Sequence, residues 1–356
     1  MPAFFPILSV LLAIAADPTT TAPAFPHTVV CADAGAGAYE AFPDIIRTKK
    51  GDLLCVFYAG FGHVSLPKWA PDGKMPAHCA RAGRICMVRS GDDGRTWSKP
   101  TIVVDTPLDD RDSSIVELPD GELLCNYFSH RADEKRGYQF VHSAMVRSRD
   151  GGKTWSEPQV LFDKWICSSP IRILSNGRLA LALYWHPGES RVRGQMHAGF
   201  TTSADNGRTW SEPIAIGKDS DIPLDAEPDV CEVTPGNLLM VMRPTMAYSW
   251  SHDGGKTWTE PRRIGFAGHA PYLHKTRGGI LLLGHRLPGT SLHYSLDDGK
   301  TWRGPVMIDA CIGSYPSLCD MPDGSVYCVY YSEGEGSDIR GMRIIAERDG
   351  IWPWKP

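Results

Sequence analysis

The sequence predicts an all-β protein, a six-bladed β-propeller with repeated Asp-box turns, and three observations carry that prediction. An eight-residue motif occurs five times, and a glycine turn between apolar strands occurs six times. Glycine and proline are abundant, with 36 and 28 residues, as turn-rich β folds require. Single repeat units cannot bury both of their faces, so we expect them to stack into a ring over residues 27–356.

The five-fold motif has the pattern Ser-x-Asp-x-Gly-x-Thr-Trp, the Asp box. Its copies are Ser90–Trp97, Ser148–Trp155, Ser203–Trp210, Ser251–Trp258 and Ser295–Trp302. An Asp side chain accepts backbone hydrogen bonds in a tight turn, Gly tolerates positive φ, and Trp can be buried between repeats. We therefore expect each box to be a structural hairpin turn and not a metal site.

The six-fold pattern is an apolar segment, a glycine turn and a second strand. The turn glycines are Gly51, Gly121, Gly177, Gly236, Gly279 and Gly324. Six such hairpins, five of them followed by an Asp box, give six four-stranded units. The last unit has no box, so we expect Arg340–Glu347 to supply one strand and His27–Ala32 to supply the outermost strand that closes the ring.

The start of the chain resembles an export signal. The apolar run Phe4–Ala16 is too short to span a bilayer and ends in small residues, which is typical of a signal peptide over residues 1–16. No Lys or Arg precedes Arg47, so an uncleaved tail or a misplaced start codon is the alternative. Residues 17–26 would form a flexible leader. We expect a secreted or periplasmic protein without a membrane span.

Charge and cysteine usage exclude several function classes. The formal net charge of −4 gives no overall basic field for nucleic acid. Among ten cysteines, Cys55, Cys125 and Cys328 occupy equivalent apolar strand positions and are expected in the core. Cys79 and Cys86 could pair in an oxidising compartment. No Cys/His spacing resembles a zinc site, and no metal or cofactor is expected.

Polar residues recur where the inner strands begin and the second strands end, two places that meet near a propeller axis. The inner-strand starts contain Tyr39, Glu40, Asp44, Arg111, Asp112, Ser168, Ser169, Glu227, Asp229, His269 and Tyr315. The second-strand ends contain His63, His130, Arg131, His186, Arg243, His285, Arg286 and Glu333. A funnel of Arg and His around a few carboxylates suits a small anionic ligand. Any single His could equally be structural.

Three segments of the chain resemble the exo-sialidases (neuraminidases), and the resemblance covers nearly everything after residue 35. Tyr315-Pro-Ser-Leu, before a strand ending at Glu333, is similar to the family's nucleophile segment. Glu227 precedes Arg243 at a spacing like that of the family's Glu and second Arg, and Arg286 lies shortly before the fifth box. The resemblance implies a Tyr315 nucleophile, Glu227 as its proton acceptor, and Arg243 and Arg286 on the substrate carboxylate.

The chemistry of sialic acid agrees with these implied roles. Its anomeric carbon carries a carboxylate, which would repel a carboxylate nucleophile but not a neutral Tyr. Because a free Tyr ionises only near pH 10, a neighbouring carboxylate such as Glu227 must help to remove the proton.

The first unit departs from the family. Ala41-Phe42-Pro43 stands where the family has Arg-Ile-Pro, and the loop ending at His63 lacks the family's acid/base Asp. Arg111 or Arg131 could replace the Arg, and Asp44, Asp112 or His63 could donate the proton. The carboxylates of Glu227, Asp229 and Glu333 could also simply neutralise Arg243 and Arg286.

Three functions remain open. The first is a retaining exo-glycoside hydrolase that removes a terminal acidic sugar from an acidic glycan or glycoconjugate, and sialic acid is the first candidate for that sugar. The second is a hydrolase or lyase on uronic-acid glycans, suggested by the recurring histidines His63, His130, His186, His269 and His285. The third is a non-catalytic carbohydrate-binding propeller, suggested by the missing Arg and Asp.

Overall fold

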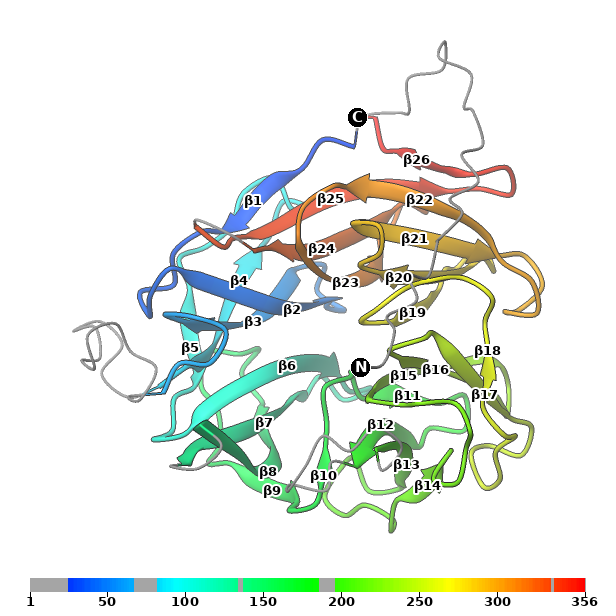
Figure 1. The fold of residues 1–356 in the computed structure, drawn as a ribbon. Coiled ribbons are helices and arrows are strands. Elements are labelled where there is room, and N and C mark those ends of the chain that lie inside the picture. Colours follow the sequence, from blue (N-terminus) through cyan, green and yellow to red (C-terminus); the bar gives the residue numbers. More distant parts are fainter. Residues whose placement is uncertain (1–24, 67–81, 134–136, 186–195, 334–335, 356) are drawn as a thin grey trace, which may run out of the picture.

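Six antiparallel sheets surround a central axis in the computed structural model, which describes residues 25–66, 82–133, 137–185, 196–333 and 336–355 (Figure 1). Each sheet is one propeller blade, so the predicted six-bladed fold is confirmed. These residues contain no helix, and hence no helix long and apolar enough to cross a membrane. The expected signal peptide at residues 1–16 and most of the leader lie outside them.

The blades follow one another along the chain, and the first strand of each lies at the axis. Blade 1 contains β2 (Tyr39–Arg47), β3 (Leu53–Gly60), β4 (Arg84–Ser90) and β5 (Thr101–Val104). Blade 2 contains β6 (Asp109–Glu117), β7 (Leu123–Asp133), β8 (Gly137–Ser148) and β9 (Gln159–Phe162). Blade 3 contains β10 (Trp165–Ile166), β11 (Arg172–Ile173), β12 (Leu179–Trp185), β13 (His197–Ser203) and β14 (Ile214–Ile216).

The second half of the ring is built in the same way. Blade 4 contains β15 (Ala226–Thr234), β16 (Asn237–Arg243), β17 (Ala247–Ser251) and β18 (Arg262–Arg263). Blade 5 contains β19 (Tyr272–Lys275), β20 (Leu281–His285), β21 (Thr290–Ser295) and β22 (Arg303–Asp309). Blade 6 contains β23 (Gly313–Asp320), β24 (Val326–Ser332), β25 (Ile339–Ala346), β26 (Ile351–Pro353) and β1 (Thr28–Cys31).

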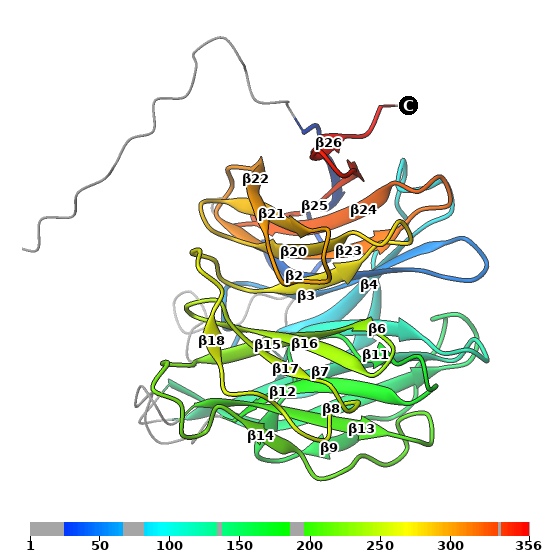
Figure 2. The same cartoon turned by 90° about the vertical axis from the view of Figure 1, so that its right-hand side faces the viewer.

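The N-terminal strand closes the ring, as the sequence predicts. β1 pairs antiparallel with β25, with Thr28 opposite Gly341. Figures 1 and 2 show blue β1 beside red β25, so the two ends of the described chain meet in blade 6. This pairing joins strands more than 300 positions apart and ties the first blade to the last.

The second strand of each blade is buried on both faces because a neighbouring blade covers each side. Every residue of β3 is buried, and its sequence LLCVFYAG is continuously apolar instead of alternating. Cys55, Cys125 and Cys328 are fully buried in β3, β7 and β24, which confirms their core role. Cys86 is a buried free thiol, and its expected partner Cys79 lies outside the described residues.

The Asp boxes are hydrogen-bonded turns between the third and fourth strands. In the first box, Asp92 accepts bonds from the Thr96 amide at 2.9 Å and its hydroxyl at 2.6 Å. These bonds lower the pKa of Asp92 to about 2. Gly94 has φ +84°, and a Cβ there would lie 2.2 Å from the ring of Tyr327 in blade 6. Only glycine fits this approach between blades. Trp97 packs on the same ring and is half-buried.

The boxes and the inner-strand starts lie on opposite faces of the ring. Arg47 pairs with Leu53, and Leu53 pairs with Ser90, the first residue of a box. Tyr39 pairs with Gly60 at the other end of the same strands. We call the Tyr39 end the upper face and the box end the lower face.

Candidate active site

A ring of strained residues marks the upper part of the axis. Four inner strands change register at the same point, and a residue that lines the axis there has positive φ in each of five blades. These are Phe42 (54°), Asp112 (46°), Glu227 (32°), Ala270 (53°) and Tyr315 (47°). Positive φ is uncommon outside glycine and costs about 1–3 kcal/mol, so it tends to occur at functional sites. All five line a central cavity of about 40 Å³.

Tyr315, Glu227 and Arg243 form a closed triangle on this ring. The Tyr315 hydroxyl donates to Glu227 Oε2 at 2.6 Å. Arg243 Nη1 lies 2.5 Å from the same oxygen and donates to the Tyr315 hydroxyl at 3.1 Å. The three residues come from β23, β15 and β16, in blades 6 and 4. The structure thus brings together three residues that the sequence placed in one site.

The charges of the triangle oppose one another at the phenol. Burial, then the carboxylates of Glu227 and Asp112, raise the pKa of Tyr315 well above its ordinary value, whereas the guanidinium groups of Arg243 and Arg286 lower it. Burial lowers the pKa of Arg243, but Glu227 and the phenol of Tyr315 raise it by more than burial lowers it. Arg243 therefore stays charged. Tyr315 is therefore neutral at rest, with a proton acceptor already in place.

Arg286 supplies a second cation above the phenol. Its guanidinium carbon lies 5.5 Å from the centre of the Tyr315 ring. Its Nε and one Nη contact His269 Nδ1 at 3.1 and 2.8 Å. Burial and the cations of Arg243 and Arg286 lower the pKa of His269 to about 3, so the imidazole is neutral and accepts from Arg286. No carboxylate in the described part of the chain forms an ion pair with Arg286.

Asp112 is the other titratable group on the ring. Burial, chiefly, and the carboxylate of Glu227 raise its pKa to about 7, against the guanidinium groups of Arg111 and Arg243. Its Oδ1 is 3.8 Å from Arg111 Nε, and that oxygen is buried without a hydrogen-bond partner among the described residues. Near neutral pH this carboxyl can both hold and release a proton.

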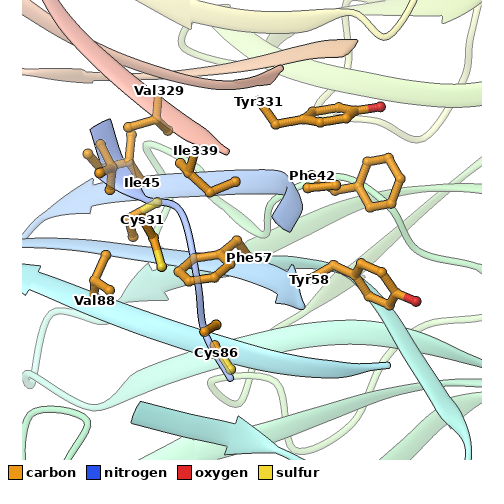
Figure 3. Packing of buried hydrophobic residues seen from close by; sticks show 14 of the residues in the cluster. Cys31, Phe42, Ile45, Phe57, Tyr58, Cys86, Val88, Val329, Tyr331 and Ile339 are labelled. Atoms are coloured by element: carbon orange, nitrogen blue, oxygen red, sulfur yellow. The ribbon is translucent and has the colours of Figure 1, made fainter. Parts of the chain in front are cut away.

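Phe42 fills the space beside Tyr315 where the resemblance led us to look for an arginine. Its ring lies 5.1 Å from that of Tyr315 and 5.2 Å from that of Tyr331. Figure 3 shows Phe42 between Tyr331 and Tyr58, at the edge of the cluster shared by blades 1 and 6. Arg111 stacks on the other side, 5.3 Å from the centre of the Phe42 ring.

The expected contact between Arg111 and a substrate carboxylate is not supported. The side chain is almost fully buried, and it donates to Asp109 and to the carbonyl of His63. Arg111 thus balances the buried charges of Asp109 and Asp112. A signal for this was the run Asp109-Asp110-Arg111-Asp112, in which three aspartates flank one arginine.

Three polar residues stand at the rim of the funnel in blades 1 and 6. The Tyr39 hydroxyl lies 3.1 Å from His63 Nδ1 and donates to Glu333 Oε1 at 3.4 Å. His63 and Glu333 are exposed, so both can meet a ligand that enters from the upper face.

Asp44, Asp229 and His285 are held by partners within the fold: Asp44 and Asp229 line the central cavity, whereas His285 is not among its lining residues. Asp44 accepts bonds from Ile115 N (2.8 Å), Ser317 Oγ (2.5 Å) and Tyr272 Oη (3.2 Å), which come from three other blades. Asp229 binds Arg172 at 2.6 Å and the Leu273 amide at 2.7 Å. His285 is fully buried, 2.7 Å from His293. Asp44 and Asp229 hold blades together, and His285 joins two strands of blade 5, since buried polar groups need such partners.

The remaining candidates lie away from the ring. β7 extends beyond the equivalent strands, so Arg131 is exposed near Gln139 and His130 packs against Tyr138. Neither is among the residues that line the central cavity. His186 lies outside the described residues. No group of three His, Cys, Asp or Glu within the described ranges could hold a metal ion.

Two contributors were missed by sequence reasoning. Asp225 Oδ1 accepts from Arg243 Nε at 3.1 Å and so helps to fix that side chain. Tyr184, buried at the end of β12, has its pKa raised well above the ordinary value, by burial first and then by Glu227 and Asp112. Asp225 stands two positions before Glu227, which was its only signal.

Comparisons with known proteins agree with this architecture. The family model of the BNR repeat-like domain matches residues 127–328, more than half of the chain. A comparison with curated protein sequences finds no match. A Dyadobacter fermentans protein of unknown function is 21% identical over 88% of this chain and 96% of its own, with a TM-score of 0.73.

Sialidases are among the similar solved structures. Hadza microbial sialidase Hz136 is 21% identical over 91% of this chain and 69% of its own, with a TM-score of 0.67. The NanB sialidase of Streptococcus pneumoniae is 14% identical over 90% and 70%, with a TM-score of 0.69. These likenesses show the shared fold. With more than half of its length matched by the family model, the chain belongs to the BNR repeat-like family.

Proposed function

We propose that this protein is a sialidase-like exo-glycoside hydrolase that removes a terminal acidic sugar with retention of configuration. Sialic acid is the first candidate for that sugar. The triangle of Tyr315, Glu227 and Arg243 is the observation that carries the proposal. A phenol bonded at once to a carboxylate and a guanidinium is the arrangement that a Tyr nucleophile needs. The sialidase names among the structural neighbours give the substrate class its first guess.

Each residue of the triangle has one step in the proposed reaction. Tyr315 Oη attacks the anomeric carbon, the bond from that carbon to the leaving oxygen breaks, and Glu227 takes the phenolic proton at 2.6 Å. Arg243 and Arg286 hold the substrate carboxylate, because guanidinium groups bind carboxylates in two-pronged fashion. Water then attacks the same carbon and frees Tyr315, so two inversions give net retention.

We assign the acid/base step to Asp112 among the three candidates. Asp44 is committed to donors from three other blades. His63 stands at the rim, bonded to Tyr39. Asp44 and Asp112 both line the central cavity, but of the two only Asp112 has a carboxylate oxygen without a hydrogen-bond partner among the described residues. Its pKa is raised to about 7, so it can protonate the leaving oxygen and later deprotonate water.

The test is release of a fluorophore from an α-sialoside by the purified protein and by Tyr315→Phe. We expect turnover by the wild type and a loss of several orders of magnitude in the variant, whose ring still packs against Phe42 but cannot attack. An unchanged rate in Tyr315→Phe would remove the mechanism. Export, expected from residues 1–16, would place the protein with extracellular glycoconjugates.

The first blade favours a second candidate, an enzyme or binder for other acidic glycans. Phe42 and the absence of the first-blade arginine leave two guanidinium groups, Arg243 and Arg286, near the phenol. A uronate carries its carboxylate away from the anomeric carbon and would place it differently. Turnover of uronides, or an ultraviolet-absorbing unsaturated product, would mark this enzyme class, and binding without turnover would mark a binder.

A further inference from the structure

A second cavity opens at the lower face of the ring, on the side of the Asp boxes. Its volume is about 550 Å³, within the usual range for a small-molecule site. We call it the basal basin. It is lined by residues 45–49, 115–116, 170–173 and 318–320 and by Tyr272, His274 and Arg277, in blades 1, 2, 3, 5 and 6. Its basic and acidic lining residues are Arg47, Lys49, Arg172, His274, Arg277 and Asp320.

The basin lies below the central cavity, with which it shares the lining residues Pro170 and Tyr272. Along β23, Tyr315 and Asp320 are five positions apart, which is about 16 Å of extended chain. The Tyr272–Asp44 hydrogen bond and the Arg172–Asp229 ion pair join residues that line the two cavities. A ligand in the basin therefore has no contact with the Tyr315 hydroxyl.

The charges that line the basin are mainly positive, although the whole chain has a net charge of −4. Four lining residues are Lys or Arg, against one carboxylate, Asp320, which faces His274 Nε2 at 3.2 Å. Glu117, beside the lining residue Val116, accepts from the Lys49 amide at 2.7 Å. The positive excess belongs to this cavity and is not a property of the whole surface.

Several of these cations have N–H groups that form no hydrogen bond with any described residue. Arg277 is exposed and forms neither an ion pair nor a hydrogen bond with any described residue. The Nε atoms of Arg47 and Arg172 are buried without a partner among the described residues. Among the described residues, the one ion pair of Arg47 is a long contact with the half-buried Asp93, at 3.5 Å. Buried donors without acceptors are rare and call for an explanation, such as an absent ligand.

The rest of the wall is apolar. Ile46, Leu318 and Ile173 line the same cavity, and Ile173 is 39% exposed. Arg172 lies over the ring of Tyr272, 4.8 Å from its centre. Cations around an apolar wall suit a ligand with a charged group and a carbon body.

We propose that the basal basin binds a small organic anion that bears a carboxylate, sulfate or phosphate group, independently of Tyr315. Guanidinium groups recognise all three through parallel hydrogen bonds, so the chemistry is shared and its source is settled by experiment. The apolar wall favours an acidic or sulfated sugar over a free inorganic ion.

Isothermal titration calorimetry of the full chain at low ionic strength tests this proposal. The probes are inorganic phosphate, glucuronate, a sulfated disaccharide and, as the neutral control, glucose. We expect a charged probe to bind, glucose not to bind, and Arg277→Ala to weaken binding at least about tenfold, because a hydrogen bond to a charged group is lost. Thermal unfolding should not change, since Arg277 has no partner in the fold.

Two variants serve as controls. Arg262→Ala removes an equally exposed arginine from β18, outside the basin, and should leave binding unchanged. Arg243→Ala removes a cation of the upper site and should also leave it unchanged. Binding of phosphate as tight as that of the sugars identifies an inorganic-anion site, and preference for the charged sugars identifies a glycan site; both support the basin. Binding that is lost in Arg243→Ala but kept in Arg277→Ala belongs to the upper site. No binding of any charged probe, equal binding by Arg277→Ala, or loss of the Arg277-dependent binding in Arg243→Ala would overturn the proposal.

Discussion

Replacing Asp112 with asparagine should flatten the dependence of stability on pH. Burial raises the pKa of Asp112 from 3.8 to about 7, so between these values the folded protein holds a proton that the unfolded chain has released. Stability from this group is complete below about pH 4 and is lost as the pH rises through 7. The difference between the two pKa values corresponds to about 4 kcal/mol, of which about 2.5 kcal/mol falls between pH 5 and pH 8.

Urea unfolding followed by tryptophan fluorescence at pH 5 and pH 8 measures this effect. Glu40 and Asp110, whose pKa values burial raises to about 7 and about 6, also contribute, so the wild type should lose more than the Asp112 share. The test compares how much the free energy of unfolding falls from pH 5 to pH 8 in the wild type and in Asp112→Asn. The difference between the two falls is the contribution of Asp112. Asparagine tolerates the positive φ at this position, so the variant should fold. Equal losses in both proteins would refute the assignment of a raised pKa to Asp112.

Three further predictions follow from the same geometry. Glu227→Gln should lower turnover of a fluorogenic α-sialoside by about 10²–10⁴-fold, because an amide cannot take the phenolic proton; initial rates within a factor of two of the wild type would exclude the base role. Asp44→Ala should destabilise the fold by about 3–5 kcal/mol in urea unfolding, since three buried donors lose their acceptor, and a loss below about 1 kcal/mol would contradict that network. His269 should stay neutral at pH 5 in an NMR titration, because burial and two guanidinium groups lower its pKa to about 3, and that pKa should rise in Arg286→Ala. A wild-type midpoint near 6.5 would count against the contact between His269 and Arg286.

The fold could be predicted almost completely because the repeats are local. An Asp box fixes its own turn through bonds four residues apart, as between Asp92 and Thr96, so its pattern survives in sequence. The six turn glycines all have positive φ, as a tight hairpin requires. Ring closure by β1 was also predicted, since blade 6 had no Asp-box hairpin to supply its outer strand.

The site could be predicted only in part because one strand offers two neighbouring positions with different surroundings. In Glu227-Pro228-Asp229 the carboxylate of Glu227 accepts a hydrogen bond from Tyr315, whereas that of Asp229 binds Arg172 of blade 3. Sequence alignment on the turn glycines placed both at the axis. Asp44, two positions after Phe42, is likewise bound by other blades, although it too lines the central cavity. The change of register in these inner strands separates the two positions, and it leaves no mark in composition or periodicity.

The site residues expected at the ends of the second strands lie away from the ring for another reason, which is the unequal length of these strands. β7 has 11 residues and β3 has 8, so His130 stands at the position of Gly60 and Arg131 extends past it. Whether a strand continues depends on the long hairpin with β8, in which Asp133 pairs with Gly137. Pairing of that kind is decided by the partner strand.

Covalent capture of the sugar on Tyr315 tests the central claim most directly. With an activated α-sialoside, the first step needs little acid assistance, whereas the second needs a base, so Asp112→Asn should accumulate the intermediate. Acid quenching followed by peptide mass mapping should then find one sialosyl group on the peptide that contains Tyr315, and none in Tyr315→Phe. Release of sialic acid without any adduct, or an adduct on another residue, would contradict the account.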